Sequence, residues 1–223
     1  MTRLLYDLAA ADESVRFSPF CWRTKLALAH KNLNYKTVPW RMTDKEAIAF
    51  SGQDKVPVLV DGSHVVADSH SIAEYLEEAY PNEASLYGEA PARALTYFIK
   101  SWADTVLHPA IARIIVPDIY ERLAEQDKAY FRSTREARIG HSFEALHARR
   151  AEAVIAFQAV LQPLHATLEA QKFIAGDAPS YADHIVFGAL QWARLMSSTN
   201  LLEANDPLAS WMDAVLETYG LET

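Results

Sequence analysis

Residues 17–31 read FSPFCWRTKLALAHK and carry the signals of an α-helix that begins just after Ser18. Ser18 is a good N-cap, and Pro19 suits the first helical position because its missing N–H would have no partner there. The stretch differs by one residue from a thiol–disulfide exchange motif, because Ser18 stands where the first cysteine of Cys-x-x-Cys would stand and Cys21 holds the second position. A helix start of this kind stabilises a thiolate, but position 18 brings no sulfur of its own.

The segments around this helix predict alternating strands and helices. The expected strands are 3–9, 34–40, which Pro39 closes, and the two runs of 56–67, and the further helices are 43–50 and 69–80. Asp61-Gly62 is a hairpin signal between the last two strands. The resulting order, β-α-β-α-β-β-α with parallel crossovers first and an antiparallel hairpin last, predicts an α/β thioredoxin-like N-terminal domain over residues 1–81.

Strand signals end after the linker at 81–91, PNEASLYGEAP, and long helical patterns follow. These patterns are an apolar repeat of Leu95, Phe98, Ile99, Trp102 and Val106, and the stretches 127–140, 142–171, 179–196 and 207–220. Pro163 is expected to kink or break the second of these stretches. Ser180 to Asp183, SYAD, matches a capping box in type, with Asp in place of Glu. We therefore predict an all-α C-terminal domain over residues 91–223.

The composition limits the classes of function. The chain has 223 residues, 50% of them hydrophobic, and its formal net charge of −8 is opposite to the excess of Lys and Arg that follows nucleic-acid phosphates. A small-molecule partner is therefore expected. Cys21 is the one cysteine, so no intramolecular disulfide can form, and the N-terminal residues turn acidic too early for a signal peptide. No apolar run reaches the roughly eighteen residues that a membrane span needs, so we expect a cytoplasmic protein.

Two interpretations of the helix start stay open. Ser18 can act only as the N-cap, which is the commoner role of a serine there, or its hydroxyl can also donate a hydrogen bond to the thiolate of another molecule. No convincing partner arrangement for a nucleophilic serine is present in the sequence. Cys21 is expected to be a small buried hydrophobic side chain, and a one-cysteine redox role is the weaker alternative.

Two further places suit an extended peptide ligand. Val56-Pro57 opens a predicted strand and leaves the backbone of Val56 free to pair with a peptide, although an ordinary edge-strand proline explains the pattern too. Asp68-Ser69 marks the start of the helix at 69–80. These two residues either cap that helix, or Ser69 and the free N–H groups bind a carboxylate while Asp68 faces an ammonium group.

Four segments of the chain resemble, in their order, the corresponding stretches of glutathione S-transferases. They are SPFCWRTKLALAHK, KVPVLVDG, ADSHSIAEYLEEAYP and FIAGDAPSYADHIVFGAL. The resemblance covers essentially the whole chain. It implies a thioredoxin-like N-terminal domain that binds glutathione, a helical C-terminal domain that supplies the acceptor pocket, and a homodimer.

The same resemblance implies roles for individual residues. Ser18 takes the place of the thiolate hydrogen-bond donor of the serine-type classes. Val56, which precedes a proline that the family keeps cis, Pro57, is implied to pair with the cysteinyl backbone of glutathione. The remaining implied contacts are Asp68 and Ser69 for the γ-glutamyl end, and Lys55, or Arg41 in its place, for the glycyl carboxylate.

A closer resemblance is to the bacterial glutathione-dependent β-etherases of lignin-fragment breakdown and to their fungal relatives. It rests on the segments LYDL, SPFCWRTKLALAHK, IAEYLEEAYP, YFRSTRE and YADHIVFGALQW. The chain departs from that subgroup because it has no long tail after its last helix and a shorter segment around residues 43–53. Cleavage of β-aryl ethers is therefore expected only as a subsidiary activity.

Aromatic and histidine patterns receive no catalytic role. Core packing is favoured over a pocket role for the five aromatic side chains considered, Trp22, Trp102, Tyr120, Phe131 and Trp192. His141 and His147 are spread too widely around a helix to hold one metal ion, so no metal site is predicted.

The sequence thus predicts a glutathione S-transferase that joins the glutathione thiolate to hydrophobic, aromatic electrophiles, with glutathione as co-substrate and Ser18 as the catalytic residue. One alternative is a non-catalytic carrier of hydrophobic ligands on the same fold, which would bind without conjugation. The other is a glutathione-dependent thiol oxidoreductase, which would act on mixed disulfides through Cys21.

Overall fold

Four strands form one mixed sheet at the N-terminal end of the chain. A computed structural model describes residues 2–203 and 205–222. The strands are β1 (Arg3–Leu8), β2 (Tyr35–Trp40), β3 (Val58–Asp61) and β4 (His64–Ala67), in the order β2-β1-β3-β4. β1 runs parallel to β2 and antiparallel to β3, and β3 and β4 form a hairpin. The predicted thioredoxin-like order, parallel first and antiparallel last, is confirmed.

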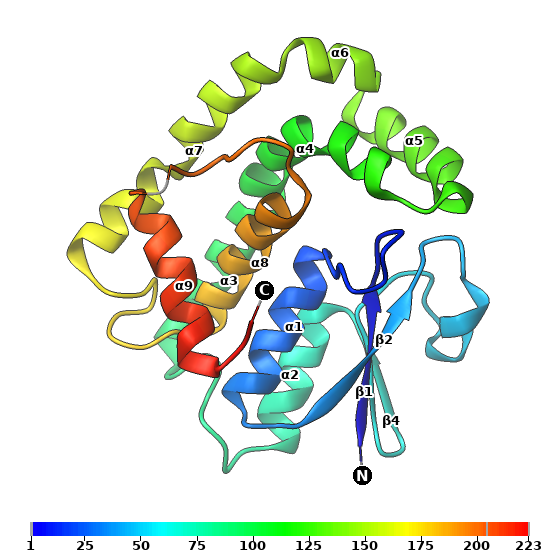
Figure 1. Cartoon of the computed structure of the whole chain (residues 1–223). Coiled ribbons are helices and arrows are strands. Elements are labelled where there is room, and N and C mark those ends of the chain that lie inside the picture. Colours follow the sequence, from blue (N-terminus) through cyan, green and yellow to red (C-terminus); the bar gives the residue numbers. More distant parts are fainter. Residues whose placement is uncertain (1, 204, 223) are drawn as a thin grey trace.

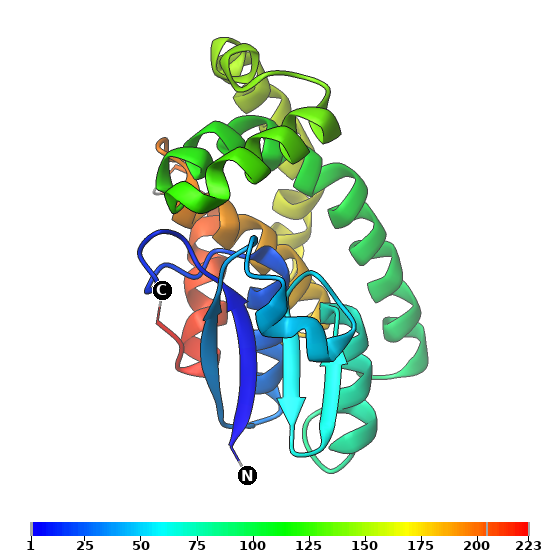
Figure 2. The same cartoon turned by 90° about the vertical axis from the view of Figure 1, so that its right-hand side faces the viewer.

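Helices α1 (Pro19–His30) and α2 (Ser69–Ala79) lie on the same face of the sheet, between it and the C-terminal helices (Figure 1). Figure 2 shows the sheet in front of this helical layer. Because α1 is covered on both sides, its polar side chains are buried with partners: Lys25 Nζ lies 2.6 Å from a carboxylate oxygen of Asp7 in β1. Burying a charge without such a partner would cost several kcal/mol, on the order of the penalties known for unpaired ions.

The C-terminal part of the chain is helical, as predicted. Its elements are α3 (Ala90–Trp102), the π-helical turn η2 (Ala103–Leu107), α4 (His108–Arg122), α5 (Glu125–Ile139), α6 (Phe143–Ala148), α7 (Arg150–Ala170), α8 (Tyr181–Met196) and α9 (Pro207–Tyr219). α3, η2 and α4 follow one another without a break, so they form one long rod (Figure 1). In the same view α6 lies at the top of the molecule and α5 at the upper right, beside the upper end of α4.

Helix α8 is the central helix of this part and packs directly on α1. The predicted capping box at its start is present: the Ser180 N–H donates to Asp183 Oδ2 at 2.9 Å, and Ser180 Oγ accepts from the Ala182 N–H at 3.1 Å. Gly188 lies where α8 meets the first turn of α1, and a Cβ atom at this position would come within 2.3 Å of the carbonyl oxygen of Pro19. The absence of a side chain therefore lets α8 pack closely against the N-terminal end of α1.

Three local predictions differ from the structure. The segment predicted as a helix at 43–50 is a 3₁₀ helix, η1 (Glu46–Ser51). In the hairpin Asp61 pairs with His64, so the two-residue turn is Gly62-Ser63 rather than Asp61-Gly62. Pro39 does not end β2 but lies within it, because β2 is an edge strand, where a missing N–H costs least.

Of the two outcomes expected at Pro163, the break is wrong, and the kink stays a prediction. Helix α7 runs through this residue, and the stretch 142–171 is divided instead at Arg149, between α6 and α7. Pro163 lies on an exposed face of α7, where water can satisfy the carbonyl group that loses its helical partner.

The apolar repeat lies on α3 and η2, but three of its members face outward. Leu95 is 67% exposed, Phe98 68% and Val106, in η2, 40%, whereas Ile99 and Trp102 are partly covered. Within residues 2–203 and 205–222, no helix combines the length and the apolar character that crossing a lipid bilayer requires.

Candidate functional site

A cavity of about 690 Å³ lies between the N-terminal end of α1 and helices α4 and α5. Its walls come from both parts of the chain. The sheet-side wall is formed by the start of α1, the end of β2 and the loop before β3, and includes Ser18, Lys55 and Val56. The helix-side wall is formed by α4 and α5, and Trp192 of α8 also lines the cavity. Both its volume and its mixture of apolar surface and few polar groups are typical of small-molecule sites.

Ser18 caps α1 and lines the cavity. Its Oγ accepts the Cys21 N–H at 3.3 Å, and its carbonyl oxygen accepts the Trp22 N–H at 3.0 Å. The side chain is buried, with 3% of the residue exposed. In the described ranges the Ser18 hydroxyl donates to no acceptor, and the N–H of Phe20 has no partner either. Two donors at the positive end of the helix are therefore available to a negative atom in the cavity.

Cys21 is a buried side chain and does not line the cavity. Its Sγ lies 4.0 Å from the carbonyl oxygen of Tyr6 on β1. Burial, together with the nearby carboxylate of Asp7, raises the pKa of this thiol well above its usual value. Cys21 is thus the small buried hydrophobic group predicted from the sequence, and it stays protonated at neutral pH.

The loop before β3 brings Lys55 and Val56 to the cavity and buries Pro57 beside it. The Val56–Pro57 peptide bond is cis, as the family resemblance implied. Among the described residues, no hydrogen bond uses the backbone N–H or C=O of Val56, so both groups can pair with an extended ligand. Lys55 is exposed and has no ion-pair partner in the part of the chain that the structure describes.

Arg41, the alternative to Lys55 as partner of the glycyl carboxylate, already has partners within the protein. Its guanidinium forms an ion pair with Glu13 at 3.0 Å and donates to the carbonyl oxygen of Ala10 at 3.1 Å. It does not line the cavity. Of the two cations, Lys55 is the better placed for a carboxylate there.

Asp68 and Ser69 lie at the start of α2, beyond the lining of the cavity. Asp68 is the N-cap: its Oδ1 accepts the N–H groups of His70 and Ser71 at 2.9 and 3.1 Å, and its φ is +76°. Ser69 is buried, and its carbonyl oxygen accepts the hydroxyl of Tyr181 at 2.8 Å. The Asp68 N–H donates to the carbonyl oxygen of Pro57 at 3.2 Å, so this helix start directly adjoins the cis-proline loop.

Two of the aromatic side chains predicted as core also line the cavity. Phe131 is buried in the core and Trp192 packs against it, and both line the cavity, whereas Trp22, Trp102 and Tyr120 do not. Arg113 on α4 and Arg135 and Arg138 on α5 were not singled out. The lining residues recur at helical spacing, for example 131, 134, 135 and 138, so periodicity marks one face of α5 but does not say what that face meets.

His108, at the start of α4, also lines the cavity and contacts a buried arginine of α1. Arg23 of α1 is buried, and its Nη2 lies 2.9 Å from Asp104 Oδ1 and 3.4 Å from His108 Nε2. Burial, with the positive charge of Arg23, lowers the pKa of His108 to about 3. His108 is therefore neutral at pH 7 and cannot act there as a cationic partner.

Two family models match the chain. The model described as the glutathione S-transferase N-terminal domain matches residues 14–84, and that of the C-terminal domain matches residues 94–219. A zeta-class glutathione S-transferase of Euphorbia esula is 29% identical over 112 residues, 48% of this chain and 50% of that one. Glutathione S-transferase 1 of Dianthus caryophyllus is 32% identical over 120 residues, 52% of this chain and 54% of that one. The chain thus spans about half the length of these curated relatives.

Solved structures match over the whole chain. A glutathione transferase from Phanerochaete chrysosporium has a TM-score of 0.86 and 25% identity and covers 100% of this chain and 99% of its own. A glutathione S-transferase of Ceriporiopsis subvermispora, solved in complex with glutathione, has a TM-score of 0.83 at 23% identity, with 100% and 99% coverage. The arrangement of a four-stranded sheet and a helical part is therefore shared with these structures.

Proposed function

Because the chain belongs to the glutathione S-transferase family, we propose that it is a glutathione transferase of the serine type, with Ser18 as the donor to the substrate thiolate. The observation that carries this proposal is the unpaired hydroxyl of Ser18 at the wall of the cavity, beside the unpaired N–H of Phe20. A serine hydroxyl is a weak nucleophile without a base, but it can donate a hydrogen bond. The start of α1 therefore retains the positive partial charge that stabilises a thiolate, and the thiolate belongs to the substrate instead of to residue 18.

The proposed binding of glutathione uses the three places that adjoin one another along the sheet edge. The backbone of Val56 pairs with the cysteinyl residue, Lys55 holds the glycyl carboxylate, and the start of α2 at Asp68 and Ser69 holds the γ-glutamyl end. This distribution suits the ligand, because one end of glutathione carries a carboxylate and the other carries both an ammonium group and a carboxylate. The hydrogen bond between the Asp68 N–H and the Pro57 carbonyl oxygen joins the start of α2 to the cis-proline loop, so these two proposed contact places stay next to each other.

The chemistry that Ser18 performs is to favour ionisation of the bound thiol. A hydrogen bond to a charged group contributes about 1.5–3 kcal/mol, and one pKa unit corresponds to about 1.4 kcal/mol. Ser18 alone therefore lowers the thiol pKa by about one to two units from its usual value near ~8.5. The proton passes to solvent, the sulfur forms a bond to an electrophilic carbon of the acceptor, and the leaving group departs with its bonding electron pair.

The acceptor is proposed to be an aromatic electrophile. Aromatic side chains from both walls surround the cavity, among them Phe20, Trp40, Tyr130 and Phe131. A thiol oxidoreductase is disfavoured because Cys21 is buried away from the cavity. Ether cleavage is retained as a subsidiary activity, in which the leaving group is an aryl oxide.

The same proposal includes the assembly, the domain division and the location of the protein. The outward-facing Leu95 and Phe98 on α3 support a homodimer, since monomeric proteins rarely leave such side chains together in solvent.

We place the division between the two domains in residues 82–90, before α3. A single, unpaired cysteine suits the reducing cytoplasm.

The test is steady-state turnover with glutathione and four acceptors: an aryl halide, an isothiocyanate, a mixed disulfide and a β-aryl ether. We expect turnover of the aryl halide, with glutathione binding measured separately by calorimetry. Ether cleavage would add the etherase activity. Binding of glutathione without any turnover would favour the carrier, turnover of the disulfide alone would favour the oxidoreductase, and absence of glutathione binding would refute the proposal.

A further inference from the structure

The cavity has a charge opposite to that of the whole protein. The formal net charge of the chain is −8, yet five lysine and arginine residues line the cavity, and the described residues that line it include no Asp or Glu. A pocket with walls of one charge sign and low dielectric concentrates ligands of the opposite sign. The five cations are Lys45, Lys55, Arg113, Arg135 and Arg138.

Two of these cations belong to the sheet-side wall, and each already has a partner in the structure or in the proposed binding of glutathione. Lys45 donates to the carbonyl oxygen of Asp54 at 2.6 Å and lies over the rings of Trp40 and Tyr130. Lys55 is the proposed partner of the glycyl carboxylate. The three arginines lie on the helix-side wall, on α4 and α5, and the proposed binding of glutathione uses none of them.

The partners of the arginines set these three apart. Of the thirteen arginines, eight form ion pairs with carboxylates: Arg3, Arg23, Arg41, Arg93, Arg132, Arg149, Arg150 and Arg194. Arg16 and Arg122 donate to backbone carbonyl oxygens. Within the described ranges, Arg113, Arg135 and Arg138 have neither kind of partner, and these are the three that line the cavity.

Arg135 and Arg138 are held close together on one face of α5. Arg135 is half-buried, lies 4.9 Å from the ring centroid of Phe131 and donates only to the hydroxyl of Thr134, at 3.0 Å. Burial and the positive charge of the neighbouring Arg138 lower the pKa of Arg135. Two neighbouring cations without a counter-ion repel each other, so an anion between them would relieve that repulsion.

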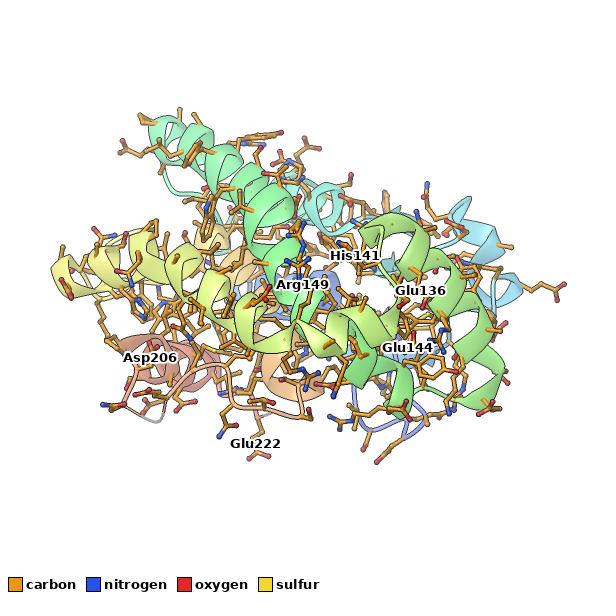
Figure 3. The ribbon with its side chains drawn as sticks, turned by 90° about the horizontal axis from the view of Figure 1, so that it is seen from above. Glu136, His141, Glu144, Arg149, Asp206 and Glu222 are labelled. Carbon is orange, nitrogen blue, oxygen red and sulfur yellow. The ribbon has the colours of Figure 1, made fainter. Side chains whose placement is uncertain are left out.

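The neighbouring carboxylates do not neutralise this face. Glu136 of α5 and Glu144 of α6 both bind Arg132, and Figure 3 shows them between these two helices. Arg132, one turn before Arg135, does not line the cavity, so these two carboxylates are paired with an arginine outside the lining.

We propose that the acceptor of this transferase is an aromatic electrophile that carries a carboxylate, with the ring between the aromatic walls and the carboxylate on Arg135 and Arg138. This inference rests on the proposed function and narrows its substrate class. The planar guanidinium fork matches a carboxylate in two-point contacts, and the apolar lining accepts the ring. Arg113, which is exposed on α4, guides the anion into the cavity from solvent.

A binding experiment tests the inference without requiring turnover. The probes are 3,5-dinitrobenzoate and its neutral counterpart 3,5-dinitrobenzamide, titrated by calorimetry in the presence of glutathione. We expect the benzoate to bind at least about tenfold more tightly, and Arg135→Met or Arg138→Met to remove about tenfold of that preference each. Methionine keeps an unbranched apolar stem over Phe131. Arg132→Met is the matched control on the same helix, because Arg132 does not line the cavity, and it leaves the preference unchanged.

A kinetic experiment applies the same contrast to the reaction. The acceptors are 4-chloro-3,5-dinitrobenzoate and its methyl ester, in which the glutathione sulfur bonds to the ring carbon and chloride leaves with the bonding electron pair. The measured quantity is the benzoate-to-ester ratio of kcat/KM, so that differences in intrinsic reactivity cancel between wild type and variants. We expect the ratio to fall about tenfold in each cavity variant, with the KM for glutathione unchanged.

The outcomes separate the two proposals. Equal binding of the two probes to the wild-type protein overturns the inference, and so does a loss of glutathione affinity in Arg135→Met with an unchanged probe preference, because the arginine would then serve glutathione. Anion-selective binding without turnover of either acceptor supports the anionic pocket and refutes the transferase.

Discussion

The two walls of the cavity are built in different ways. On the sheet side, Ser18 and Val56 are positioned by short-range features: a helix cap at 3.3 Å and a cis-proline loop. On the helix side, Phe131, Arg135 and Arg138 are positioned by how α5 packs over the molecule, and the two arginines have no carboxylate partner among the described residues. The comparison teaches that the first wall is specified locally and the second by packing. Under the proposed function, the first wall would hold glutathione and the second would select the acceptor.

Substitution of Ser18 has the largest expected effect and tests the sheet-side wall. Ser18→Ala removes a donor to the developing or bound thiolate, and loss of one such donor lowers turnover by about 10²–10³-fold. It also removes a helix cap, which costs about 1 kcal/mol of stability. The measurements are kcat with an aryl halide and the pH at which bound glutathione shows thiolate absorbance, which should rise.

Ser18→Thr is the control for this prediction because it keeps a hydroxyl in the same place. It should retain most of the turnover and the low thiol pKa. Equal kinetics for Ser18→Ala and the wild type would leave Ser18 as a helix cap alone.

Gly188→Ala tests whether the sheet-side wall depends on packing after all. The added Cβ would meet the Pro19 carbonyl oxygen at 2.3 Å, so α8 or the first turn of α1 must move. Overpacking of this kind costs about 1–3 kcal/mol. We expect a lower melting temperature together with reduced turnover, because the moved turn carries Ser18. A stability loss with unchanged kcat would show that the Ser18 cap tolerates the shift.

Lys55→Met tests whether Lys55 is the residue that binds the glycyl carboxylate of glutathione. Loss of one charged partner at an exposed site should weaken glutathione binding by about tenfold, measured by calorimetry. Arg41→Met is the matched control, since Arg41 pairs with Glu13 and does not line the cavity. The reverse result, a loss only in Arg41→Met, would transfer the role to Arg41.

His108 gives the smallest effect and probes the helix-side wall. Its folded pKa is lowered to about 3, while an unfolded histidine titrates near ~6.5, so the unfolded chain binds more protons between these values. The free energy of unfolding therefore falls as pH drops from about 6.5 towards about 3, by up to ~1.4 kcal/mol per pH unit. His108→Gln should flatten this slope in urea unfolding measured at several pH values.

The exposed His141, labelled in Figure 3, provides the comparison for that experiment. His141→Gln should leave the slope as it is in the wild type. An unchanged slope in His108→Gln would mean that this histidine is not the buried neutral group that the structure places beside Arg23.

Local patterns predicted the features that depend on neighbours in the chain. The cap at Ser18, the capping box of Ser180 and Asp183 and the hairpin after Val58 are all present, because these interactions join residues within nine positions of each other in the chain. The failures share the opposite property. Pro163 stays inside α7 because its face is exposed, which only the packed molecule decides.

Taken by itself, the sequence determined the thioredoxin-like order and the helical second part, and it predicted that Ser18 caps α1. Tertiary structure alone decided that Cys21 lies outside the cavity lining, that Arg41 pairs with Glu13, and that Arg135 and Arg138 line the cavity with no carboxylate partner among the described residues. The physical reason is that helical periodicity defines which side chains share a face, whereas the environment of that face is set by elements distant in the chain.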